Sequence, residues 1–235
     1  MKKSRGKDRY ETELAKAQLE ALKVRMNPHF IANALTSIRS MLYRDEKDSA
    51  IDYLTMFAKL IRTTLENASR EFITLAAEIE YIGNYLEIEK VRFAGKFDTS
   101  ILVAADLMAT DTLVPPTIFQ PYIENAINHG LMHRTSGGVL TINFQAHNKL
   151  LKCTIEDNGV GRQRAKEMEN RSLTGHTSLS EQITRERLAL YNKIFKTFDF
   201  TIETTDLKDE FEIASGTRVL IQLPLRSIYT ENEIK

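Results

Sequence analysis

The chain has 235 residues, of which 42% are hydrophobic and 27% are charged, a composition that suits one or two globular domains and excludes a fibrous or disordered protein. Basic and acidic residues number 32 each, so the formal net charge is zero and no overall field favours nucleic acid as a partner. The single cysteine, Cys153, excludes an internal disulfide and is predicted to be a small core residue in a reducing compartment.

The first twelve residues, 1–12, are strongly basic. Their positive charges are Lys2, Lys3, Arg5, Lys7 and Arg9. This pattern predicts either a solvated tail or a linker that follows a membrane helix on its cytoplasmic side. No run reaches the roughly 20 apolar residues that cross a bilayer, so we expect the chain itself to be soluble.

Residues 13–95 are predicted to be helical, because only one proline, Pro28, and no glycine occur between Gly6 and Gly83. Apolar residues recur there every three or four positions in two runs, Leu22, Met26, Phe30, Ala34, Ile38 and Leu42, and then Ile51, Leu54, Phe57, Ile61 and Leu65. Two amphipathic helices joined near 44–48 are therefore expected. Asp48 is predicted to cap the second helix, and Thr74 to cap a third.

Residues 96–225 are predicted to be of the α+β class, because the hydrophobic period changes there. The expected strands lie near 101–103, 140–144, 151–155, 200–204 and 217–223, with a turn at 147–149. Helices are expected around 116–130 and 179–196. The second of these begins with Ser178 to Glu181, which fits a capping box.

His29 follows Pro28, which lacks a backbone donor and therefore begins or kinks a helix. On a helix His29 shares a polar face with Asn33. A neutral imidazole has a ring nitrogen that can attack phosphorus, and the Asn33 amide could orient water toward a phosphorylated histidine. The alternative interpretation is an exposed histidine and a solvated asparagine without chemical roles.

Three polar clusters follow in the second half. Glu124 to Gly130 places carboxylate, amide and imidazole groups along a helix, which suits Mg²⁺ and phosphate oxygens. Asp157 to Gly161 ends a predicted strand, where the carboxylate can accept a hydrogen bond from a base amino group and glycines allow a ligand to approach. Gly216 and Thr217 could complete a base pocket. Taken singly, the clusters also fit a helix cap, a turn and a strand start.

These segments, in this order, resemble the LytS/YehU-type sensor histidine kinases. The resemblance covers roughly Leu14 to Leu225 and is carried by Met26 to Phe30, by Tyr85 to Phe93 and by the stretch from Pro115 to Gly130. The clusters at Asp157 to Gly161 and at Gly216 and Thr217 resemble the nucleotide-binding boxes of the wider superfamily of Hsp90-like, gyrase, kinase and MutL ATPases.

The resemblance implies an α+β fold in which a helical dimerisation and histidine phosphotransfer domain, 13–95, precedes an α/β sandwich that binds ATP, 96–225, and a C-terminal tail, 226–235. It implies ATP and Mg²⁺ as cofactors and assigns a site role to several residues. Asn125 would hold Mg²⁺, Glu124, Asn128 and His129 would lie near the phosphates, Asp157 would recognise adenine, and Gly159, Gly161 and Thr217 would shape the adenine pocket.

The implied activity is ATP-dependent autophosphorylation on His29, followed by transfer to an aspartate of a response-regulator receiver domain. The implied partners are a second copy, through the N-terminal helices, and a membrane-embedded sensor segment upstream, so we expect the cytoplasmic portion of an inner-membrane protein. Phe30 stands where many histidine kinases place an acidic residue, so the general base is unassigned. Glu124 is a candidate by analogy with ATPases of the superfamily, and a structural role beside magnesium is the alternative.

Two other functions remain open from the sequence, an ATP-hydrolysing clamp of the same superfamily and a pseudokinase scaffold. His29 favours the kinase over the clamp. The expected ATP lid, 162–180, lacks a second glycine-rich box, with only Gly175 before Ser178, so altered lid closure is predicted.

Overall fold

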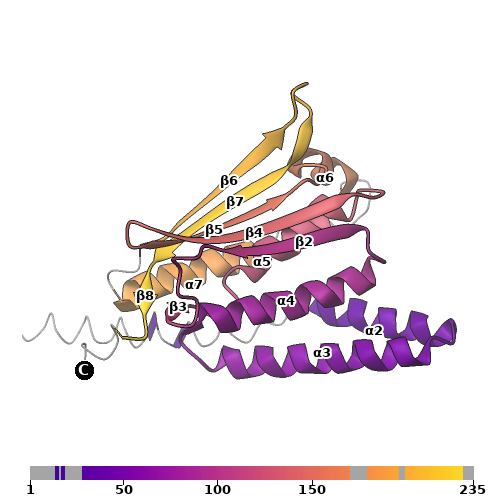
Figure 1. Cartoon of the computed structure of the whole chain (residues 1–235), viewed down its shortest axis with the longest axis horizontal. Helices are drawn as coiled ribbons and strands as arrows, with labels where there is room; N and C mark the ends of the chain where they lie inside the picture. Colours follow the sequence, from indigo (N-terminus) through magenta and orange to yellow (C-terminus); the bar gives the residue numbers. More distant parts are fainter. Residues whose placement is uncertain (1–13, 16, 19–27, 170–178, 196–198, 230–235) are drawn as a thin grey trace, which may run out of the picture.

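The computed structural model describes residues 14–15, 17–18, 28–169, 179–195 and 199–229 (Figure 1). The predicted basic tail, 1–12, lies outside the described residues. No helix within the described ranges is long and apolar enough to cross a membrane.

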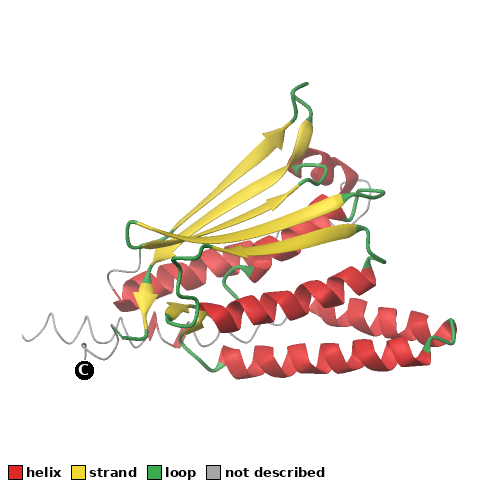
Figure 2. Cartoon of the chain, viewed as in Figure 1, coloured by secondary structure: helices red, strands yellow, loops and turns green. Residues whose placement is uncertain are grey.

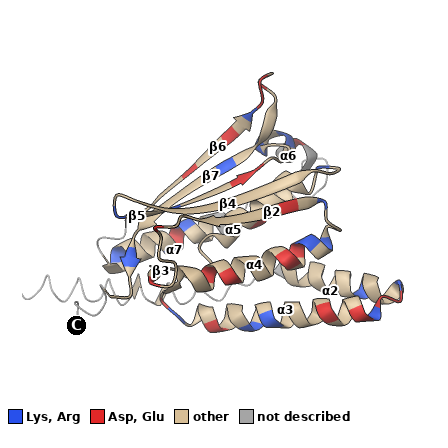
Figure 3. Cartoon of the chain, viewed as in Figure 1, with Lys and Arg blue, Asp and Glu red and all other residues tan. Residues whose placement is uncertain are grey.

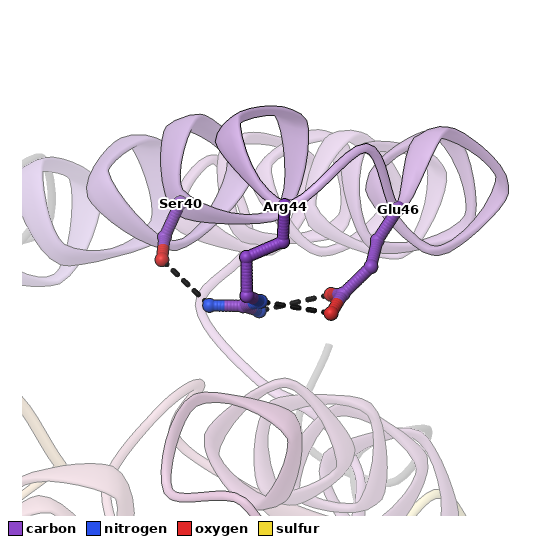
Figure 4. Close-up of polar contacts among 3 residues, drawn as sticks. All are labelled: Ser40, Arg44 and Glu46. Carbon is purple, nitrogen blue, oxygen red and sulfur yellow. Dashed lines mark hydrogen bonds and ion pairs between the residues drawn. The ribbon is translucent and has the colours of Figure 1, made fainter.

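Three long helices make up the N-terminal half: α2 (Pro28–Tyr43), α3 (Lys47–Ala68) and α4 (Leu75–Arg92). The predicted hairpin between α2 and α3 is confirmed, and Arg44 braces its turn (Figure 4). The Arg44 guanidinium donates to both carboxylate oxygens of Glu46 at 2.8 and 2.9 Å, and to Ser40 Oγ at 2.7 Å. Between them Asp45 has a φ of 60°, which lets the chain reverse.

The start of α4 is capped as expected, whereas the start of α3 is not. The Thr74 hydroxyl accepts a hydrogen bond from the backbone N–H of Ala77 at 3.2 Å. The prediction that Asp48 caps α3 is wrong, because the helix begins at Lys47 after Glu46, which makes no side-chain cap. Asp48 instead lies in the first turn, where its charge complements the helix dipole. Figure 3 shows acidic and basic residues interspersed along α3.

A five-stranded sheet forms the second half, in the order β2-β4-β5-β7-β6. Its strands are β2 (Phe97–Val103), β4 (Gly138–His147), β5 (Leu150–Asp157), β6 (Thr201–Lys208) and β7 (Ala214–Pro224). All five confirm the expected strands. The β4–β5 turn at Asn148 and Lys149 is also confirmed, with φ of 49° and 64°. Only the β2–β4 pair is parallel, and the other neighbours are antiparallel.

A small second sheet, β1 (Ile73–Thr74), β3 (Thr112–Val114) and β8 (Arg226–Ser227), was not expected from the sequence. It connects the start of α4 to the last part of the described chain. The Arg226 guanidinium lies 4.6 Å from the ring centroids of both Phe72 and Phe195, and the second of these contacts holds β8 against the end of α7 (Leu179–Phe195).

Helices lie on one face of the large sheet (Figure 2). They are α5 (Gln120–Asn125), the π-helix η1 (Ala126–Leu131), α6 (Arg162–Glu169) and α7 (Leu179–Phe195). The helix predicted from 116 begins only at Gln120, because Thr117 has a φ of 55° that a helix does not accommodate. Ser178 lies outside the described residues. Cys153 is buried in the core, as predicted, and the α+β fold class is confirmed.

Candidate active site

The site is built on the end of β5. Buried and partly exposed residues alternate along this strand, so its last residue, Asp157, continues the buried apolar row of Leu151, Cys153 and Ile155. Asp157 is directly opposite Leu140 on β4 and Thr217 on β7. The strand register therefore places a carboxylate, 3% exposed, on the helix-covered face of the sheet.

Three distant chain segments meet at Asp157. The backbone N–H of Gly159 donates to Asp157 Oδ1 at 2.8 Å. A Cβ added to Gly130 would lie 2.7 Å from the same oxygen, and one added to Gly216 would lie 1.9 Å from the Asp157 carbonyl oxygen. Each of the three polar clusters recognised in the sequence thus supplies a residue to one place, and two of the glycines are needed because a side chain would not fit.

Burial raises the pKa of Asp157 to about 6, an effect to which the neighbouring Glu156 charge adds. Hydrogen bonds from the backbone of Gly159 and Thr217 act in the opposite direction. The carboxyl is therefore ionised at neutral pH while little water reaches it. A desolvated acceptor of this kind forms strong hydrogen bonds with a donor that enters the site.

Gly159 and Gly161 allow the chain to pass closely through this region. A Cβ on Gly159 would lie 2.5 Å from the backbone of Gly130. Gly161 has a φ of 78°, and a Cβ there would lie 2.8 Å from that of Ala214. The turn between β5 and α6 consequently lies directly against η1 and the start of β7.

The consecutive helices α5 and η1 carry the polar residues of the first cluster. Glu124 and Asn128 lie one turn apart and have different partners: Glu124 Oε1 accepts from Gln120 Nε2 of the same helix at 2.7 Å, and Asn128 Oδ1 accepts from Arg92 Nη2 on α4 at 2.8 Å. Each precedes by one position a half-buried residue, Asn125 and His129 respectively. The π-helical turn is a widened geometry that is frequent at functional sites.

The candidate phosphoacceptor lies at the start of α2. His29 is the second residue of this helix, and its side chain lies outside the described part of the structure. The following residue, Phe30, has its ring centroid 5.8 Å from that of Phe57 and 5.3 Å from that of Tyr85 on α4. Asn33 is half-buried on the same helix. Of the expected lid, 162–169 form α6, and 170–178 lie outside the described residues.

Sequence reasoning gave no role to three residues that contact the site. The Tyr81 hydroxyl donates to Gln120 Oε1 at 2.7 Å, which turns the Gln120 Nε2 group toward Glu124. Tyr81 and Gln120 are two of these residues, and the third is Arg92, which donates a hydrogen bond to Asn128. The available signal was the stretch from Tyr85 to Phe93, which resembles histidine kinases and contains Arg92, a residue to which no role was assigned.

Over the described ranges, no group of three His, Cys, Asp or Glu side chains could hold an ion. Mg²⁺ in nucleotide sites commonly takes one or two protein oxygens together with phosphate oxygens and water. The Asn125 amide, half-buried at the end of α5, fits that smaller role.

Sequence comparison connects the chain to known proteins. Residues 17–97 match the histidine kinase family. The chain is 36% identical over 148 residues to the sensor protein LytS of Oceanobacillus iheyensis, an alignment that covers 63% of this chain and 25% of that protein. The chain is a relative of the LytS-type sensor histidine kinases. This confirms the resemblance seen in its motifs.

A second relative is the sensor histidine kinase BtsS of Escherichia coli K12, 34% identical over 153 residues, 64% of this chain and 26% of that protein. The chain thus spans about a quarter of the length of these two relatives. Among solved structures, the Acinetobacter baumannii histidine kinase AdeS aligns at a TM-score of 0.45 and 15% identity over 85% of this chain and 98% of that one. The relatedness to sensor histidine kinases rests on the sequence matches.

Proposed function

We propose that this chain is the kinase core of a two-component sensor, which binds Mg-ATP in its sheet domain and phosphorylates His29. The observation that carries the proposal is the convergence of three glycines on Asp157: Gly130 and Gly159 lie against its buried carboxylate, and Gly216 lies against its backbone carbonyl. The LytS-type relatedness supports the same activity.

In this proposal Asp157 accepts a hydrogen bond from the exocyclic amino group of adenine, and Gly159, Gly161 and Thr217 form the walls around the base. Adenine offers a donor there, which a desolvated carboxylate prefers. Asn125 binds Mg²⁺, with Asn128 and His129 near the phosphates. The Mg²⁺ ion neutralises part of the phosphate charge when it is bound.

The phosphoryl step needs one nucleophile and one proton acceptor. A ring nitrogen of His29 forms a bond to the γ-phosphorus, the bond to the β–γ bridging oxygen breaks, and ADP leaves with the electron pair. The imidazole proton passes to a base, for which Glu124 is our candidate. The phosphoryl group then moves to an aspartate of a receiver domain, and Asn33 positions water when phosphohistidine is hydrolysed.

We further propose that two copies associate through α2 and α3, and that the whole protein carries a membrane-embedded sensor segment before this cytoplasmic core. Exposed apolar residues recur at helical spacing on the hairpin: Leu35 and Leu42 on α2, and Ile51, Leu54 and Leu65 on α3. An apolar stripe of this kind is typical of a helix that packs against a partner.

The test is incubation of the purified chain with γ-labelled ATP and Mg²⁺. We expect label on the protein that is stable in alkali and lost in acid, as phosphohistidine is, and absent from His29→Gln. His147→Gln, at the exposed end of β4, is the matched control and should be labelled like wild type. Free phosphate without labelled protein would favour the ATPase clamp, and neither product would favour the scaffold.

A further inference from the structure

Arg92, the last residue of α4, connects the helical half of the chain to the candidate phosphate-binding helix. We propose that Arg92 is a positioning residue that fixes the orientation of the Asn128 amide, so that its N–H groups are presented to the phosphates of a nucleotide. The proposal rests on the nucleotide site proposed above and adds a determinant of its affinity.

The amide orientation follows from the donor count. Arginine has only donors, so the atom of Asn128 that lies 2.8 Å from Arg92 Nη2 must be its carbonyl oxygen, Oδ1. The remaining polar atom of that side chain, Nδ2, carries two N–H donors. Phosphate oxygens are acceptors only. An Asn128 turned the other way would direct its oxygen at phosphate and repel it.

The guanidinium itself is held from two further directions. The same Nη2 contacts Glu89 Oε2, one turn earlier on α4, and the guanidinium carbon lies 4.2 Å from the centroid of the Phe93 ring. The Glu89 side chain is 1% exposed and that of Arg92 is 14% exposed. A planar guanidinium confined in this way has few alternative positions, so Asn128 has one fixed partner.

The burial of the ion pair between Arg92 and Glu89 indicates that the pair fixes the position of the guanidinium rather than adding stability. Burial raises the pKa of Glu89 to about 7, against the charge of Arg92, which lowers it. Buried ion pairs contribute little net stability, because desolvation of both charges offsets their attraction. A neighbouring pair on the same helix, Lys90 with Glu87, is exposed at 31% and 61% and lacks a bond to the site. It provides a matched control.

The experiment is a double-mutant cycle on nucleotide affinity, measured by titration calorimetry with a non-hydrolysable ATP analogue and Mg²⁺. In metal sites, removal of a group that orients a ligating side chain costs about ten- to hundredfold in affinity, and we take the lower end for this site. We expect Arg92→Gln and Asn128→Ala each to raise Kd about tenfold, and the double variant to match the weaker single variant, because both remove the same contact. Lys90→Gln should keep the wild-type Kd.

Arg92→Lys provides a second test in case Arg92→Gln does not fold. It retains the charge beside Glu89 but lacks the planar fork, so it should unfold like wild type and bind nucleotide less tightly. Independent effects that multiply to about a hundredfold in the double variant would overturn the inference, as would wild-type affinity in a folded Arg92→Gln. A wild-type chain that binds no nucleotide would overturn the proposed function together with this inference.

Discussion

Asp157 combines two properties that oppose each other, a charge that a ligand can use and a position in the core. Its pKa of about 6 lies above the ordinary value of 3.8, so the folded state binds the proton more tightly than the unfolded chain does. Between those two values, stability therefore falls as pH rises, and above about pH 6 the full loss is present. Keeping this acceptor ionised destabilises the nucleotide-free protein.

Replacing Asp157 with asparagine should remove that loss. A pKa difference of about two units corresponds to roughly 2 to 3 kcal/mol, so Asp157→Asn is expected to be more stable than wild type by about 2 kcal/mol at pH 7.5 and equal to it near pH 4. Urea unfolding across this pH range measures the difference. Asp98→Asn, at an exposed carboxylate on β2, is the control and should not change the pH profile. If the stability of Asp157→Asn changed with pH in parallel with that of wild type, the assignment of this loss to Asp157 would be refuted.

Gly216 is the position at which a single methyl group should have the largest effect. Its φ is 143°, and a Cβ would lie 1.9 Å from the Asp157 carbonyl oxygen, which is backbone and cannot rotate away. We expect Gly216→Ala to lower the free energy of unfolding by about 3 kcal/mol. Gly83→Ala is the matched control, because nothing lies within 4 Å of its added Cβ inside α4. It should stabilise the protein by about 0.5 to 1 kcal/mol. Equal effects of the two substitutions would contradict the assigned geometry.

At the scale of elements, α4 begins where the sequence places a cap. Thr74→Ala removes the acceptor for the Ala77 N–H and should cost about 1 kcal/mol in chemical denaturation. Thr63→Ala on α3 is the comparison, because its hydroxyl only donates to the Lys59 carbonyl of the same helix. That substitution should change stability by less than about 0.5 kcal/mol. If Thr74→Ala and Thr63→Ala lowered the free energy of unfolding equally, the cap would contribute no more than an ordinary hydroxyl within a helix.

The long elements could be predicted because their own periodicity encodes them. Strict alternation identifies β5, and the apolar repeats identify α2 and α3. The elements that were missed depend on distant partners. The two-residue strand β1 exists only because Ile73 pairs with Val114, and β8 because Ser227 pairs with Thr112. Glu46, rather than Asp48, precedes α3 since the Arg44 turn sets where the chain reverses.

The candidate site likewise contains residues that a local pattern predicts and contacts that depend on distant parts of the chain. Gly130, Asp157 and Thr217 were recognisable because each lies in a compact local cluster, and the antiparallel register then brings Thr217 opposite Asp157. The bond from Arg92 to Asn128 joins residues 36 positions apart and depends on how α4 packs against η1. No local pattern contains that information. His29 and Asn33 remain predictions from the sequence.

At the scale of the whole molecule, the exposed apolar stripe on α2 and α3 predicts how two copies associate. Leu35 is 54% exposed and Leu54 is 49% exposed. The double variant Leu35→Glu with Leu54→Glu should convert the dimer to monomers, measured by sedimentation, because unpaired carboxylates would be buried at the interface. The double control, Leu102→Glu with Val139→Glu, places charges on exposed apolar positions of the sheet and should leave a dimer. Dissociation by the control pair alone would place the interface on the sheet.

The parallel pairing of β2 with β4 has a consequence for local unfolding. The connection between these strands contains α5 and η1, and therefore every candidate residue from Glu124 to Gly130. Among the described strands, β2 is an edge strand that pairs only with β4. We expect it to detach from the sheet together with the connection that follows it, and its amide hydrogens to exchange in that open state. A nucleotide that contacts both η1 and Asp157 would hold the connection closed, by about 2.7 kcal/mol at a hundredfold excess over Kd. Slower hydrogen exchange in β2 after addition of nucleotide would then report occupancy of the site.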